Sequence, residues 1–161
     1  MAGEGGGERH ETELERADRN FTELLQELRV AQTGVQILFA FLLTIPFARG
    51  FAGVDAFRRL VYVGTLLACA GATALLVAPV SFHRIVFRKH HKRELVAATN
   101  VLAQGGLALL ALSLVGSVLL VVDVVLGRPA GLLLAGATAL LFVLLWYVLP
   151  LVSLARWRGR P

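Results

Sequence analysis

Residues 95–122 read LVAATNVLAQGGLALLALSLVGSVLLVV and contain no Asp, Glu, Lys or Arg over 28 positions. An α-helix needs about 20 apolar residues to cross the ~30 Å hydrocarbon core of a bilayer. Hydrocarbon cannot hydrogen-bond to exposed peptide groups, so a segment that crosses it must satisfy those groups within a helix. This stretch is therefore predicted to form a transmembrane helix.

Three other stretches lack charged residues in the same way: residues 30–48, 60–82 and 129–155, with 19, 23 and 27 positions. The whole chain is 57% hydrophobic and 17% charged, whereas soluble domains are about 45–50% apolar and ~25% charged. The stretches show neither the polar stripes of a soluble helical bundle nor the alternating polarity of barrel strands. We therefore predict an all-α integral membrane protein whose domain covers residues 30–155. Its four transmembrane helices are expected at about residues 30–48, 60–82, 100–122 and 130–152.

The distribution of Lys and Arg predicts how these helices are oriented. With four spans, the N-terminal tail, the central loop and the C-terminal tail share one side of the membrane, and they carry 12 cations against four on the other side. Cytoplasmic loops retain an excess of Lys and Arg. We therefore expect a multi-pass protein of the cell (inner) membrane with both termini in the cytoplasm, including a basic tail at residues 156–161.

The expected cytoplasmic segments carry opposite charges. Residues 1–10 are Gly-rich and are expected to be disordered. Residues 11–29 place an apolar residue at every third or fourth position, which predicts an amphipathic acidic helix. The central loop has five cations that we expect to contact anionic phospholipids of the cytoplasmic leaflet: Arg84, Arg88, Lys89, Lys92 and Arg93. The acidic tail could instead pair with this loop, and the basic patch is too small to predict nucleic-acid binding.

The connections between spans predict two antiparallel hairpins. Only residues 123–128 separate the third span from the fourth, and Gly127 and Pro129 supply turn chemistry. The hairpins could be copies of one another, because AQTGVQIL at residues 31–38 is similar to AQGGLALL at residues 103–110, at an offset of 72. Apolar sequence of low complexity also produces such matches by chance, so the sequence leaves both explanations open.

Polar residues within the spans form the candidate site. The residues in question are Gln32, Thr33, Gln36, Thr44, Asn100, Gln104 and Asp123. They could line a hydrated path that ends near an acid, since a carboxylate in a membrane is a candidate proton or cation carrier. They could equally bond across helices, beside small residues that let helices approach closely. Such small residues recur at Gly64, Ala68 and Ala72, at Gly131, Ala135 and Ala139, and on the face of the third span that carries Gly106 and Gly116. Asp123 could also be an acid at the membrane surface that pairs with Arg128.

Nothing in the sequence predicts a metal, a cofactor or catalytic residues. The histidines of the central loop, His83, His90 and His91, lie among cations that disfavour a divalent ion. Cys69 is the single cysteine. No phosphate-binding loop, nucleophile–base pair or pair of carboxylates occurs, so we do not expect an enzyme.

Two segments resemble a known family. Residues 23–47, ELLQELRVAQTGVQILFAFLLTIPF, and residues 78–84, APVSFHR, are similar to an actinobacterial family of small four-span membrane proteins of unknown function. Some members of that family carry an automatic sodium:proton antiporter label. The resemblance implies the four-span architecture and supplies no site residues.

Two functions remain to be compared. The first is a non-enzymatic membrane module, an accessory or scaffold subunit that associates with itself or with a partner membrane protein. The alternative is a small proton-coupled cation transporter similar to a sodium:proton antiporter. Because no acid falls at the middle of a span, a transporter of this kind would need to be an oligomer.

Overall fold

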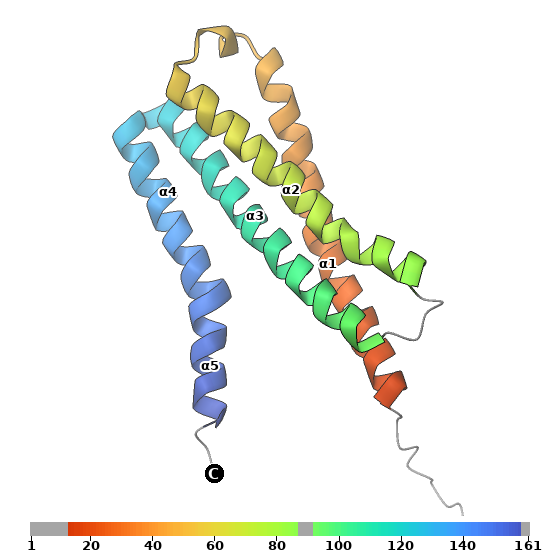
Figure 1. Cartoon of the computed structure of the whole chain (residues 1–161). Coiled ribbons are helices and arrows are strands. Elements are labelled where there is room, and N and C mark those ends of the chain that lie inside the picture. Colours follow the sequence, from red (N-terminus) through yellow and green to blue (C-terminus); the bar gives the residue numbers. More distant parts are fainter. Residues whose placement is uncertain (1–12, 87–91, 159–161) are drawn as a thin grey trace, which may run out of the picture.

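The computed structural model of the protein describes residues 13–86 and 92–158, and all of its regular structure is helical. The long helices run up and down beside one another (Figure 1). The α-helices are α1 (Glu13–Thr44), α2 (Ala56–Val86), α3 (Lys92–Leu126), α4 (Arg128–Val143) and α5 (Leu149–Arg158). Two 3₁₀ turns, η1 (Ile45–Phe47) and η2 (Phe51–Gly53), join α1 to α2, and a π-helical turn, η3 (Leu144–Val148), joins α4 to α5.

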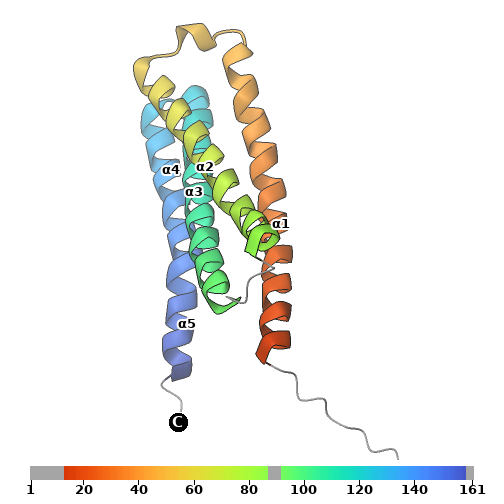
Figure 2. The ribbon, with the colours of Figure 1, turned by 45° about the vertical axis from the view of Figure 1, so that its right-hand side comes forward.

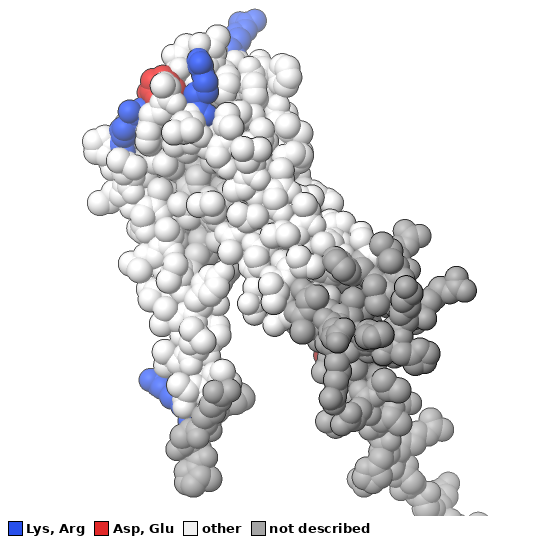
Figure 3. Space-filling view, in the orientation of Figure 1, with Lys and Arg blue, Asp and Glu red and all other residues white. Residues whose placement is uncertain are grey.

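The prediction of an all-α protein with four spans is confirmed. In the described part of the chain, four helical segments are long and apolar enough to cross a membrane: Leu28–Phe47, Ala56–Ser81, Thr99–Leu126 and Arg128–Arg156. Figure 3 shows an uncharged surface between the charged groups at the two ends of the molecule. The protein is therefore a multi-pass membrane protein. The second span begins at Ala56 rather than near residue 60, because the helix continues through Arg58 and Arg59, where the charge-free stretch stops.

Helix α1 differs from the expected separate cytoplasmic helix at residues 11–29. It runs without a break from Glu13 to Thr44, so residues 13–29 and the first span form one helix (Figure 2). Residues 13–33 contain neither Gly nor Pro and are rich in Ala, Leu, Glu and Arg, which favour a continuous helix. The expected disordered tail at residues 1–10 lies outside the described residues.

Helices α2 and α3 form the centre of the bundle, with α1 packed mainly on α2 and α4 packed on α3. The core lies where α1, α2 and α3 meet and contains Val35, Cys69, Ala72 and Leu76, each fully buried. Glycines bring α2 and α3 close together. A Cβ atom on Gly106 would lie 2.7 Å from Cγ of Leu76, and one on Gly116 would overlap the side chain of Thr65.

Three side-chain hydrogen bonds tie α1 to α2. The Gln32 amide donates to the Leu76 carbonyl at 2.6 Å, and the Tyr62 hydroxyl donates to the Leu42 carbonyl at 3.0 Å. Between them, the Cys69 thiol lies 3.6 Å from the Val35 carbonyl. By contrast, the hydroxyls between α2 and α3 bond to carbonyls of their own helices: Thr65, Thr73, Ser113 and Ser117. The α2–α3 interface therefore depends mainly on close packing, although the Ser113 hydroxyl also interacts with the Cys69 thiol across it.

Removing the Tyr62 hydroxyl tests one of these hydrogen bonds. Tyr62→Phe is expected to lower the free energy of unfolding by about 0.6 kcal/mol and by no more than ~1.7 kcal/mol, the range for side-chain hydrogen bonds between membrane helices. Unfolding with sodium dodecyl sulfate, followed by circular dichroism, measures this change. Tyr147→Phe is the control, because the described residues offer its hydroxyl no hydrogen-bond partner. Equal stability of the two variants would show that the hydrogen bond from Tyr62 to the Leu42 carbonyl does not stabilise the protein.

The π-helical turn η3 has a local cause in Pro150. Proline lacks the N–H that would donate to the carbonyl four residues earlier, and its ring collides with that carbonyl in a regular α-helix. The wider turn accommodates this ring, and the Leu149 N–H donates to the Leu144 carbonyl, five residues back. Beyond this turn, α5 continues away from α3 (Figure 1).

Candidate functional site

Asp55 directly precedes the second span and shapes the candidate site. Its Oδ1 atom accepts a hydrogen bond from the backbone N–H of Arg58 at 2.9 Å, which is the contact of an N-terminal helix cap. This hydrogen bond, together with the Arg128 guanidinium, holds the pKa of Asp55 below its ordinary value. The cap fixes the first turn of α2, and the Arg58 side chain leaves from that turn toward α3.

Arg58 binds the end of α3 through Asp123. Its Nε lies 2.9 Å from Oδ2 of Asp123, and its Nη2 donates to the Asp123 backbone carbonyl at 3.0 Å. The Asp123 side chain is only 2% exposed. A guanidinium at the carboxyl end of a helix also meets the negative end of the helix dipole. The carboxylate is therefore buried against its counter-charge.

Arg128 completes the cluster from the start of α4. Its Nη2 lies 2.7 Å from Oδ2 of Asp55 and 3.7 Å from Oδ2 of Asp123. Its guanidinium carbon also lies 4.2 Å from the centre of the Phe57 ring, within cation–π range. Two carboxylates and two guanidiniums thus join α2, α3 and α4 with no net charge. We call Asp55, Arg58, Asp123 and Arg128 the ion-pair layer.

Helix α4 covers Asp123. A Cβ atom on Gly131 would lie 3.1 Å from both the Cβ and the backbone nitrogen of Asp123, and both Gly131 and Ala135 are buried. Cation sites use carboxylate and carbonyl oxygens that remain free to coordinate. Here the oxygens of Asp123 face guanidiniums, so the arrangement is suited to holding three helices together.

The structure does not bring the seven predicted site residues together. No hydrogen bond joins any two of them in the described part of the chain. Thr33 and Thr44 bond to carbonyls of their own helix, while Gln36 and Asn100 are exposed. Along α3, Gln104 is 19 residues from Asp123, or about 29 Å at 1.5 Å per residue.

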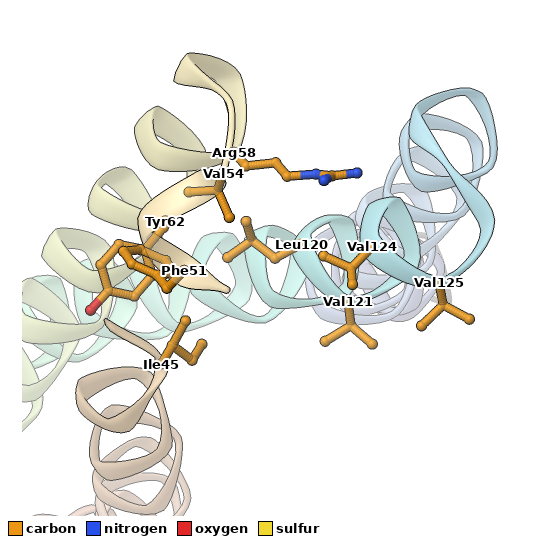
Figure 4. A pocket seen from close by; sticks show the side chains of 9 residues that line it. All are labelled: Ile45, Phe51, Val54, Arg58, Tyr62, Leu120, Val121, Val124 and Val125. Atoms are coloured by element: carbon orange, nitrogen blue, oxygen red, sulfur yellow. The ribbon is translucent and has the colours of Figure 1, made fainter. Parts of the chain in front are cut away.

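The bundle carries half-open clefts between its helices. One, of about 550 Å³, lies between α3 and the η3–α5 segment, and we call it the α3–α5 cleft; its lining residues are Gln104, Leu107, Trp146, Tyr147, Pro150 and Leu151. Another, of about 240 Å³, lies beside the ion-pair layer. Figure 4 shows the Arg58 side chain reaching over this second cleft, past Val54 and toward α3, above Leu120 and Val124. The walls of the second cleft are apolar apart from Arg58.

Several predicted headgroup contacts fall outside what the structure describes. Arg88 and Lys89 lie outside the described residues. Arg84, Lys92 and Arg93 occupy the ends of α2 and α3, and their side chains also lie outside the described part. Among the described residues, no group of three or more His, Cys, Asp or Glu could hold a metal ion.

Sequence reasoning missed Asp55 and Arg58. Arg58 was counted only as a loop cation, since the charge-free stretch that marks the second span begins after it. Asp55, directly before Ala56 and the apolar run, is an N-cap signal that could have started the helix there and placed Arg58 within α2. At that position it stands at the same end of the bundle as Asp123.

Comparisons with known proteins give a family but no activity. No curated protein and no solved structure matches the chain. The profile of one family matches residues 10–150, which is most of the chain. The chain therefore belongs to that family, a family of unknown function (DUF6328).

Proposed function

We propose that the protein is a non-enzymatic membrane module, an accessory or scaffold subunit that acts through contacts within the bilayer. The ion-pair layer carries this proposal. Asp123 is the only acid within the described spans, and it is paired with two guanidiniums. A proton or cation carrier in a membrane needs an ionisable group that can exchange its partner, whereas Asp123 is 2% exposed and covered by α4.

The packing of the bundle supports the same conclusion. Gly106 and Gly116 leave no room for even a methyl group between α2 and α3. Gln32 on α1 donates to a backbone carbonyl of α2. The clefts described above are half-open at the surface of the bundle, where lipid or a partner would meet them.

The surroundings of the module form part of the proposal. We place it in the cell (inner) membrane with both termini in the cytoplasm, as the distribution of Lys and Arg favours. The cations of the central loop would then face the anionic phospholipids of the inner leaflet. The acidic first half of α1 would present its charges to a partner on the same side of the membrane.

A flux measurement separates the module from the transporter. Purified protein in liposomes that contain a pH-sensitive dye is expected to give the same proton flux as protein-free liposomes under an inward sodium or potassium gradient. A cation-driven flux that Asp123→Asn abolishes would overturn the proposal.

In a second experiment, tagged protein is recovered from membranes with its partners. Removing residues 1–26, which spares the buried Leu28, is expected to abolish partner recovery, while removing residues 1–10 is not. Unchanged recovery after the longer deletion would contradict the role of the acidic segment.

A further inference from the structure

The α3–α5 cleft is open at one end of the hairpin and closed at the other. At the ion-pair layer, Gly131 packs on the backbone of Asp123, and Ala135 is buried one turn further along α4. Toward the end of the bundle where α1 begins and α5 ends, α5 moves away from α3 beyond the π-helical turn (Figure 1). The space-filling view shows uncharged surface on both sides of this separation (Figure 3). The cleft therefore extends over only part of the length of the α3–α4 contact.

The position of the cleft across the membrane follows from the number of residues that separate it from the ion-pair layer. Gln104 is 19 residues from Asp123 along α3, and Tyr147 is 19 residues from Arg128 along the last span. At 1.5 Å per residue both distances are about 29 Å, which equals the thickness of the hydrocarbon core. With the ion-pair layer at one membrane surface, the cleft lies at the opposite surface. Trp146 and Tyr147, which line it, are residues typical of that position.

Trp146 and Tyr147 bring an indole N–H and a hydroxyl to the lining of the cleft, and Gln104 brings an amide. In the described part of the chain this amide has no hydrogen-bond partner, although it faces a cleft with mostly apolar walls. Gln32, 72 positions earlier in the similar segment, donates its amide to the Leu76 carbonyl at 2.6 Å. The position 72 residues after Leu76 is Val148, inside the π-helical turn. In the first hairpin, α1 and α2 are therefore joined by this hydrogen bond, whereas at the corresponding position of the second hairpin a cleft separates α3 from α5.

We infer that the α3–α5 cleft binds one anionic glycerophospholipid from the leaflet at the terminal end of the bundle. An acyl chain would lie against Leu107, the ester region would accept the hydrogen bond of the Gln104 amide, and Leu151 would line the headgroup end of the cleft. The headgroup would face the end of α5, where Arg156 is exposed. This charge favours an anionic headgroup.

A lipid fits this cleft better than a second transmembrane helix. A helix with its side chains is about 10–12 Å wide, and a transmembrane helix passes through both leaflets. Here Gly131 and Ala135 close the half of the contact next to the ion-pair layer. A volume of about 550 Å³ is typical of small-molecule sites. A lipid confined to one leaflet fits both the volume of the cleft and its limited length.

Native mass spectrometry of the full chain tests the inference. The protein, released from mixed micelles with equal phosphatidylglycerol and phosphatidylcholine, is expected to retain one phosphatidylglycerol per chain. Phosphatidylglycerol is expected to exceed phosphatidylcholine on the order of fivefold, the effect of one cation near the headgroup. Leu151→Trp, which fills the cleft, and Gln104→Leu, which removes the amide, are each expected to reduce retention about tenfold. Leu154→Trp and Asn100→Leu are the matched controls on the same helices, because neither residue lines the cleft.

Three results would overturn the inference: equal retention of the two lipids, unchanged retention in both cleft variants, or a dimer that replaces the lipid-bound monomer. The last would assign the cleft to a second copy of the chain. If Leu151→Trp lowers helicity by circular dichroism, Gln104→Leu decides, since it changes an exposed side chain without adding volume to the core. The inference does not depend on the liposome flux, so the two tests can fail separately.

Discussion

Asp123→Ala is expected to lower the free energy of unfolding by about 3 kcal/mol. Removing one partner of a buried ion pair costs roughly 3–5 kcal/mol, because the other charge remains without compensation. Arg58 would lose its 2.9 Å contact to Oδ2 of Asp123. Since 30% of its side chain is exposed, water would partly solvate it, which places the cost at the lower end of that range. The Gly131 contact with the Asp123 backbone would remain.

The matched control is Asp55→Asn. The Asp55 side chain is 48% exposed, and asparagine can still accept the cap hydrogen bond from the Arg58 N–H. Loss of its charge is expected to cost about 0–1 kcal/mol, as for exposed ion pairs. Unfolding in detergent micelles with sodium dodecyl sulfate, monitored by circular dichroism, measures both variants. Equal losses in the two variants would show that burial of Asp123 has no energetic consequence.

A double-mutant cycle identifies the partner of Asp123. Arg58→Ala should be nearly as costly as Asp123→Ala, and the double variant should lose less than the two single losses added together. The same cycle with Arg128→Ala should give a smaller coupling, because Arg128 lies 3.7 Å from Asp123 and 2.7 Å from Asp55. A larger coupling to Arg128 would favour the pairing considered from the sequence alone.

The four spans could be predicted because each depends on local composition. About 20 residues without charge can cross the hydrocarbon core as a helix regardless of which helices pack beside them. Residues 95–122 meet that condition on their own. The helix boundaries were less well predicted. Arg58 and Arg59 lie inside α2. Arg58 pairs with Asp123, and a helix at the membrane surface can carry an exposed cation such as Arg59 whose charged end reaches the headgroups.

The candidate site could not be predicted in the same way, because it depends on which helices meet. Gln32 and Gln104 occupy similar local sequences, AQTG and AQGG. Gln32 nevertheless bonds to α2, while Gln104 faces an open cleft. The difference arises on the partner helix, where Pro150 and the π-helical turn separate α5 from α3. Likewise, the contact of Asp123 with Arg58 joins residues 65 positions apart, which no local pattern reports.

The packing of the small residues could not be predicted from the sequence either, and it leads to the second prediction of a large loss of stability. Gly64 and Gly106 both read as positions for close helix contact, yet a Cβ atom on Gly64 meets nothing within 4 Å, while one on Gly106 lies 2.7 Å from Cγ and 3.2 Å from the backbone nitrogen of Leu76. Leu76 is fully buried and bonded through its carbonyl to Gln32, so it has little freedom to move.

Gly106→Ala is therefore expected to lower the free energy of unfolding by about 1–3 kcal/mol, the cost of overpacking a core. Gly116→Ala should fall in the same range, because the added methyl group meets the stiff, β-branched side chain of Thr65. Gly64→Ala, in contrast, should be neutral or raise the stability by up to about 1 kcal/mol, since alanine favours a helix and the position is open. The same unfolding assay compares the three variants. A loss at Gly64 as large as that at Gly106 would contradict the arrangement of α2 and α3 described above, in which Gly64 has open space around it and Gly106 has none.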